Sequence, residues 1–97
     1  DDGIPVAGDV IAFDVGSQYA GQSISVNLTV TGAAARGFAT LYACDQDRPD
    51  TSSLNYQAGQ SIANGVITKV SAQGEVCVYV NRSAHVILDV FGVLPSR

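Results

Sequence analysis

Residues 23–31 alternate strictly between apolar and polar side chains, and this alternation constrains the fold more than any other feature of the chain. Ile24, Val26, Leu28 and Val30 occupy the even positions, and Ser, Asn and Thr occupy the odd ones. Successive side chains of a β-strand point to opposite faces, so the pattern predicts a strand with one buried and one wet face.

Shorter segments of the same kind follow one another along the chain, separated by residues typical of turns. We expect seven or eight short strands, with a hairpin turn at residues 81–83 and a bulge at Asn64-Gly65. Phe13, Phe38 and Phe91 are expected in the core. The expected strands cover residues 10–15, 23–31, 38–44, 53–57, 61–70, 75–81 and 84–91.

Ninety-seven residues make one domain, and no long helical crossover is present to join parallel strands. Since each strand has one apolar face, either two sheets pack together or one sheet closes on itself. We expect an all-β fold, an antiparallel β-sandwich with immunoglobulin-like Greek-key connections, spanning residues 1–97. A small closed β-barrel or a jelly roll is the alternative.

The charge and composition exclude several classes of function. With a net charge of −4 and five Lys plus Arg, the chain lacks the clustered cations that bind nucleic acid. A run of apolar residues long enough to span a bilayer is absent. One His and two Cys are too few for a structural zinc site. We therefore expect no cofactor, nucleic acid or membrane span.

Cys44 and Cys77 are the chain's two cysteines. In a small, Gly-rich β domain without metal partners, such a pair favours a disulfide, and a disulfide indicates an oxidising compartment. Two unpaired, buried thiols are the alternative. The disulfide implies a secreted or cell-surface protein.

Four segments carry a family resemblance: SVNLTVTG at 25–32, GFATLYAC at 37–44, VCVY at 76–79 and AHVILDVFG at 84–92. In this order they resemble a repeat module of secreted actinobacterial proteins. The resemblance implies an immunoglobulin-like accessory domain that lies beside hydrolase or peptidase domains or in tandem. It also implies that residues 1–97 were excised from, or processed out of, a longer exported chain. It implies no particular ligand.

His85 is the single histidine, and a catalytic histidine must reach both a nucleophile and an orienting acid. Asp89 lies four residues later on the same strand, about 13 Å away by the strand rise, so the two side chains cannot meet. No Gly-x-Ser-x-Gly motif occurs. We therefore expect no enzyme, and His85 is a ligand-contact candidate beside the simpler interpretation of a strand residue opposite Tyr79.

The four tyrosines, Tyr19, Tyr42, Tyr56 and Tyr79, are candidates for a carbohydrate-binding platform, with Tyr19 first because it lies in a loop. Tyr is also common at strand edges, where its ring packs and its hydroxyl stays wet. The amide side chains that would complete such a platform are Asn27, Asn55 and Asn64.

Asp45, Asp47 and Asp50 lie in one loop after Cys44, and their carboxylates are possible ligands for weakly bound calcium. Arg48 interrupts the series and no bidentate Glu follows, which favours a solvated acidic loop. Two functions stay open for the whole domain. One is a non-catalytic module that binds cell-envelope carbohydrate or a protein, and the other is a spacer or self-assembly module of a secreted protein.

Overall fold

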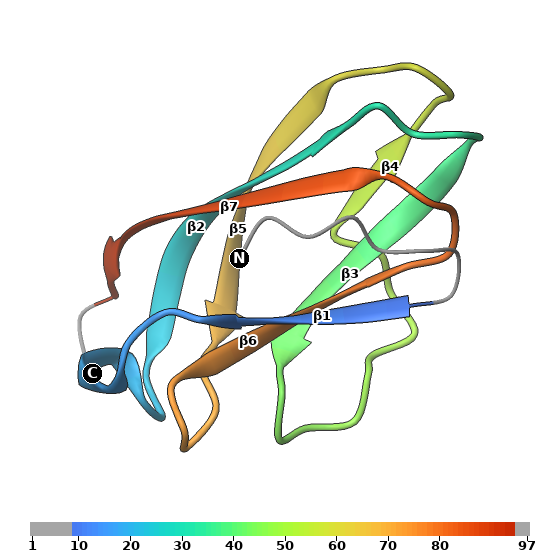
Figure 1. Ribbon diagram of the computed structural model, residues 1–97. Coiled ribbons are helices and arrows are strands. Elements are labelled where there is room, and N and C mark those ends of the chain that lie inside the picture. The colour runs from blue at the N-terminus through green and yellow to red at the C-terminus, as the bar shows by residue number, and fades with distance from the viewer. Residues whose placement is uncertain (1–8, 95–97) are drawn as a thin grey trace.

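The computed structural model describes residues 9–94, which form two antiparallel sheets packed face to face (Figure 1). The predicted β-sandwich is confirmed, and the closed barrel is excluded because the seven strands divide into two separate sheets. No helix within residues 9–94 is long and apolar enough to cross a membrane. The elements are β1 (Asp9–Asp14), the 3-10 turn η1 (Ser17–Tyr19), β2 (Ser23–Thr31), β3 (Gly37–Ala43), β4 (Leu54–Tyr56), β5 (Ile62–Lys69), β6 (Glu75–Val80) and β7 (His85–Val93).

One sheet has four strands in the order β1-β6-β3-β4, and the other has three in the order β5-β2-β7. The β2–β5 and β3–β6 pairs are those expected of an immunoglobulin-like Greek key. The terminal strands lie differently, since β1 pairs with β6 and β7 pairs with β2. The last strand thus becomes an edge of the three-stranded sheet.

The alternation in β2 produces the centre of the core. Ile24, Val26, Leu28 and Val30 are fully buried, while the intervening polar side chains are half-buried on the outer side of the sheet. Val76, Val78 and Val80 of β6 face them from the other sheet's core surface. Burial of such side chains stabilises the fold by about 1.5–3 kcal/mol each.

The predicted hairpin between the last two strands is wrong, because β6 and β7 belong to different sheets. The connection at residues 81–83 crosses the sandwich and is bonded to segments around it. The Asn81 side chain accepts a hydrogen bond from the Phe38 N–H at 2.8 Å, and the Ser83 carbonyl accepts one from the Ala34 N–H at 3.0 Å. Strand periodicity is the same for a hairpin and for a crossing connection, so it cannot separate them.

The predicted bulge at Asn64-Gly65 is also wrong. The β2–β5 register runs unbroken through these residues, from Ser23 opposite Lys69 to Val30 opposite Ile62. A bulge occurs instead in β7, where the register with β2 shifts and Phe91 is the extra residue.

Of the three phenylalanines placed in the core, only Phe13 is buried. Phe38 is half-buried against the Tyr79 ring, with the ring centroids 6.0 Å apart. Phe91 is 69% exposed, so its prediction as a core residue is wrong. Together with the odd positions of β7, at His85 and Ile87, it points away from the core.

Candidate functional site

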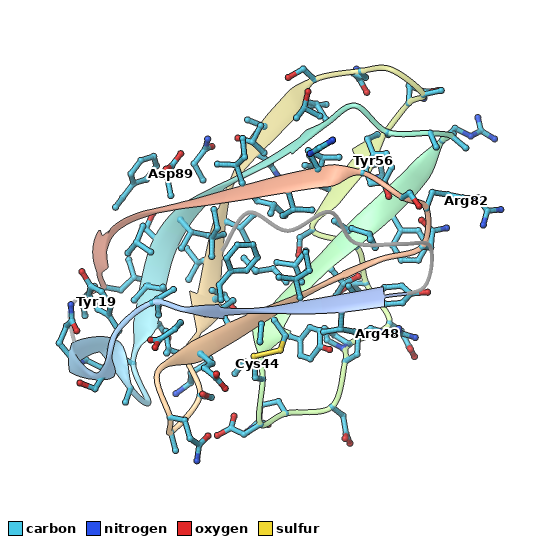
Figure 2. All side chains as sticks on the ribbon, in the orientation of Figure 1. Tyr19, Cys44, Arg48, Tyr56, Arg82 and Asp89 are labelled. Atoms are coloured by element: carbon cyan, nitrogen blue, oxygen red, sulfur yellow. A yellow bond between two sulfur atoms is a disulfide. The ribbon has the colours of Figure 1, made fainter. Side chains whose placement is uncertain are left out.

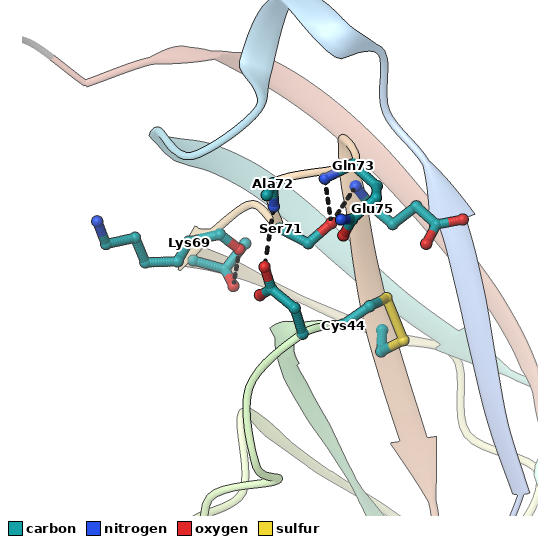
Figure 3. Close-up of a disulfide and its surroundings, with 9 residues drawn as sticks. Cys44, Lys69, Ser71, Ala72, Gln73 and Glu75 are labelled. Atoms are coloured by element: carbon teal, nitrogen blue, oxygen red, sulfur yellow. Dashed lines mark hydrogen bonds between the residues drawn. A yellow bond between two sulfur atoms is a disulfide. The ribbon is translucent and has the colours of Figure 1, made fainter.

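The predicted disulfide joins Cys44, just after β3, to Cys77 in the middle of β6, with the Cα atoms 5.0 Å apart (Figures 2 and 3). The bridge links two neighbouring strands of the four-stranded sheet and closes a separation of 33 residues. Disulfides persist in oxidising compartments, so this feature is typical of an extracellular protein.

Asp45, beside the bridge, has a structural partner. Its carboxylate accepts a hydrogen bond from the Ala72 N–H at 3.0 Å (Figure 3). The buried Ser71 hydroxyl accepts bonds from the Gln73 and Glu75 N–H groups in the same turn. Asp45 therefore ties the end of β3 to the β5–β6 connection.

The rest of the acidic loop folds toward the four-stranded sheet. The Arg48 guanidinium lies over the Tyr79 ring, 3.7 Å from its centroid, while Asp47 and Asp50 are exposed. Within residues 9–94, no three His, Cys, Asp or Glu side chains gather where a metal ion could bind. The geometry therefore gives the calcium interpretation no support.

The four candidate tyrosines do not form one platform. Tyr42 and Tyr79 lie on the outer side of neighbouring strands β3 and β6. Tyr19 packs against the core from η1, and Tyr56 is itself a core residue. The companion amides are equally dispersed, since they lie on three different strands: Asn27 on β2, Asn55 on β4 and Asn64 on β5.

Tyr56 is the tyrosine with the most distinct environment. Its hydroxyl donates a 2.7 Å hydrogen bond to the Arg82 carbonyl (Figure 2). Desolvation raises the pKa of this hydroxyl above its ordinary value, and the Arg82 charge opposes that rise only in part. A side chain so enclosed stabilises the fold and is not available to a ligand.

His85 lies exposed at the start of β7, opposite Thr31 on β2. Its expected neighbour Tyr79 is on the other sheet. The imidazole rests against the β2–β3 turn, where a Cβ added to Gly32 would be 3.2 Å from the ring. Asp89 is exposed on the same side of β7, as the strand period predicts.

The outer side of the three-stranded sheet carries most of the exposed large apolar side chains found in residues 9–94. Phe91 is 69%, Ile67 64% and Ile87 46% exposed. Small and polar residues of β2 and β5 lie between them. We call this surface the three-stranded face. It consists of Ser23, Ser25, Asn27, Thr29, Thr31, Ala63, Gly65, Ile67, Lys69, His85, Ile87, Asp89 and Phe91.

The backbone of β2 divides its hydrogen-bonding groups between its two neighbours. The Val70 N–H donates to the Gln22 carbonyl at 2.8 Å, so the backbone N–H and C=O groups of the even-numbered residues of β2 point toward β5. The Leu94 N–H donates to the Ser23 carbonyl at 3.0 Å, so the backbone N–H and C=O groups of the odd-numbered residues point toward β7. Alternation of this kind is a property of every antiparallel strand.

The same alternation identifies the groups at the open side of β7. On the His85 side of the bulge, the residues that lie opposite odd-numbered positions of β2, and so bond to it, are His85, Ile87 and Asp89. Their neighbours direct N–H and C=O groups the other way, where no strand of the described chain pairs with β7. These outward-directed residues are Val86, Leu88 and Val90.

Ile67, Ile87 and Phe91 were absent from the candidate site residues derived from sequence. A signal exists for the two on β7, because Ala84, Val86, Leu88 and Val90 define the core side of that segment. Two large apolar residues at odd positions, Ile87 and Phe91, then belong to the outer side. Their positions in the alternation, more than their hydrophobicity, mark them as surface residues.

No protein family, curated protein or solved structure matches this chain. The function is therefore inferred from the groups that the sandwich exposes. The most distinctive of these are the apolar side chains of the three-stranded face and the backbone edge of β7.

Proposed function

We propose that this chain is a non-catalytic extracellular module that binds a protein partner at the cell surface through the three-stranded face and β7. The observation that carries the proposal is the exposure of Ile67, Ile87 and Phe91 on one side of one sheet. Large apolar side chains exposed on one face of a small domain are typical of interaction sites.

A protein partner accounts for these groups better than a carbohydrate does. Aliphatic side chains such as Ile67 and Ile87 gain free energy by burial against other apolar groups. Sugar recognition depends on aromatic rings presented together, whereas Tyr56 is buried and Tyr19 packs against the core. The partner that suits this surface best offers apolar side chains and an exposed β-strand of its own.

The extracellular part of the proposal is supported by the Cys44–Cys77 disulfide. The non-catalytic part is supported by the position of His85. The chain's single histidine lies exposed at an edge strand, with Thr31 opposite, and Asp89 points from the same side of that strand four residues away.

Site-directed photo-crosslinking on the surface of the producing cells tests this proposal. A benzophenone amino acid replaces Phe91, and a matched control replaces Asn55, which is exposed on β4 of the other sheet. We expect protein adducts from position 91 that are much stronger than those from position 55. Equal labelling from both positions, or adducts to polysaccharide alone, would contradict the proposal.

A further inference from the structure

Strand β7 has the properties of an edge that pairs with another strand. It is nine residues long and contains neither Lys nor Pro, the residues that commonly protect an edge from pairing. The other edges of the described sheets are shorter. β4 has three residues, β1 has six with an aspartate at each end, and β5 has eight and ends in Lys69.

The polar side chains on the outer side of β7 are complementary to one another as hydrogen-bond donor and acceptor. His85 precedes Ile87 by two residues and Asp89 follows it by two, and all three belong to the three-stranded face. If the strand pairs antiparallel with its own copy about a two-fold axis at Ile87, each His85 lies opposite the Asp89 of the other copy. Each imidazole then donates one hydrogen bond to the carboxylate of the other copy, so the dimer contains two such bonds, one on each side of the axis.

The backbone groups agree with this register. Val86 of one copy then faces Leu88 of the other, and both residues direct N–H and C=O groups to the open edge. They form the hydrogen-bonded pairs of the new ladder. His85 and Asp89 fall in the pairs without hydrogen bonds, where side chains approach most closely.

We propose that β7 of one chain pairs antiparallel with β7 of a second copy, with Ile87 on the two-fold axis and His85 opposite Asp89. This inference deepens the proposed function, on which it rests, by naming the partner at the β7 edge as a second copy of the chain, in a contact that leaves Ile67 uncovered. It joins the two three-stranded sheets into one continuous sheet. Phe91 of one copy then lies beside the connection at residues 81–83 of the other copy, where part of its exposed ring is removed from water.

Self-pairing through β1 would form a shorter ladder, because β1 has six residues against the nine of β7 and its sequence, DVIAFD, begins and ends with aspartate. Packing of two three-stranded faces against each other would instead bury Ile67, which lies on β5 at the far side of the sheet. The two arrangements therefore differ in their dependence on Ile67.

Sedimentation velocity of the full chain from micromolar to millimolar concentration tests the inference. We expect a monomer–dimer equilibrium that Ile87→Lys weakens about tenfold or more, because two ammonium groups then meet at the axis. Ile67→Lys, an exposed isoleucine on the same face, is the matched control and should leave the equilibrium unchanged. Circular dichroism of each variant verifies that the sheets are intact.

A charge exchange tests the register itself. Asp89→Lys should weaken the dimer, and His85→Asp combined with Asp89→Lys should restore it, because the double variant places an aspartate opposite a lysine on each side of the axis. A monomer at every concentration, an equal effect of Ile67→Lys and Ile87→Lys, or a double variant no stronger than Asp89→Lys would overturn the inference. If position 91 crosslinks to a different protein and the purified chain is monomeric, the partner is not a second copy of the chain, and the proposed function still holds.

Discussion

The Tyr56 hydroxyl donates a 2.7 Å hydrogen bond to the Arg82 carbonyl, which connects the short edge strand β4 to the crossing between the two sheets. Tyr56 is 1% exposed, so the bond lies where water cannot easily replace it. This bond connects two segments that strand pairing alone leaves separate.

Tyr56→Phe should reduce the free energy of unfolding by about 1–2 kcal/mol, because the Arg82 carbonyl loses its donor while the ring is kept. Urea unfolding followed by circular dichroism measures the loss. Tyr42→Phe, half-buried on the outer side of β3, is the control and should change stability by less than about 0.5 kcal/mol. Equal effects of the two substitutions would contradict the role given to Tyr56.

The same hydroxyl should make stability depend on alkaline pH. Burial raises the pKa of Tyr56 in the folded chain, so the folded state holds this proton more tightly than the unfolded state. Its contribution is fully present below about pH 10, the ordinary tyrosine value, and is lost as the pH rises through the folded-state pKa. Urea midpoints from pH 8 to 11 should therefore fall less steeply for Tyr56→Phe than for the natural chain.

Removal of the Cys44–Cys77 bridge should destabilise the domain by about 3–4 kcal/mol in the chain-entropy treatment of a loop of this length. Unfolding of the natural chain with and without reductant gives one measurement, and the double variant Cys44→Ser with Cys77→Ser gives an independent one. A mass that does not rise by about two daltons on reduction under denaturing conditions would show that the bridge is absent.

Truncation to alanine should destabilise the fold strongly at Phe13 and hardly at all at Phe91, although the sequence places both in the core. Phe13→Ala should cost about 3–5 kcal/mol because its ring is buried between the sheets. Phe91→Ala should leave the stability of the monomer within about 0.5 kcal/mol, since its ring is 69% exposed. Thermal unfolding at low protein concentration compares them, and a large loss for Phe91→Ala would place that ring inside.

The Arg48 guanidinium over the Tyr79 ring should contribute about 0.5–1 kcal/mol, as expected for an exposed cation–π contact. Arg48→Gln should remove this contribution and make the loop before β4 more sensitive to proteolysis. Arg36→Gln, in the exposed β2–β3 connection, changes the net charge equally and serves as the control. Identical proteolysis rates for the two variants would show that the contact does not order the loop.

The sequence alone predicts the strands well because each carries its own evidence. The boundaries of β2 follow from its alternation, and Cys44 and Cys77 could only pair with each other. In these cases the local pattern and the tertiary packing agree.

The alternation of residues along a strand does not indicate to which of the two sheets the strand belongs. β6 and β7 have apolar sides that suit a hairpin as well as two facing layers, so their separation could not be read from periodicity. Asn64-Gly65 is a common turn signal, but continuous pairing with β2 keeps it in a regular strand. The open edge of β7 depends on the complete strand order and is therefore visible only in the assembled fold.

Amide hydrogen exchange along β7 tests most directly the claim that this strand is an open pairing edge. In dilute solution, the amides of Ile87 and Asp89 should be protected by β2, while those of Val86, Leu88 and Val90 exchange quickly. At high concentration the second group should become protected as the strand pairs with a second copy. Protection of all five amides in dilute solution, or fast exchange of the second group at every concentration, would contradict this account.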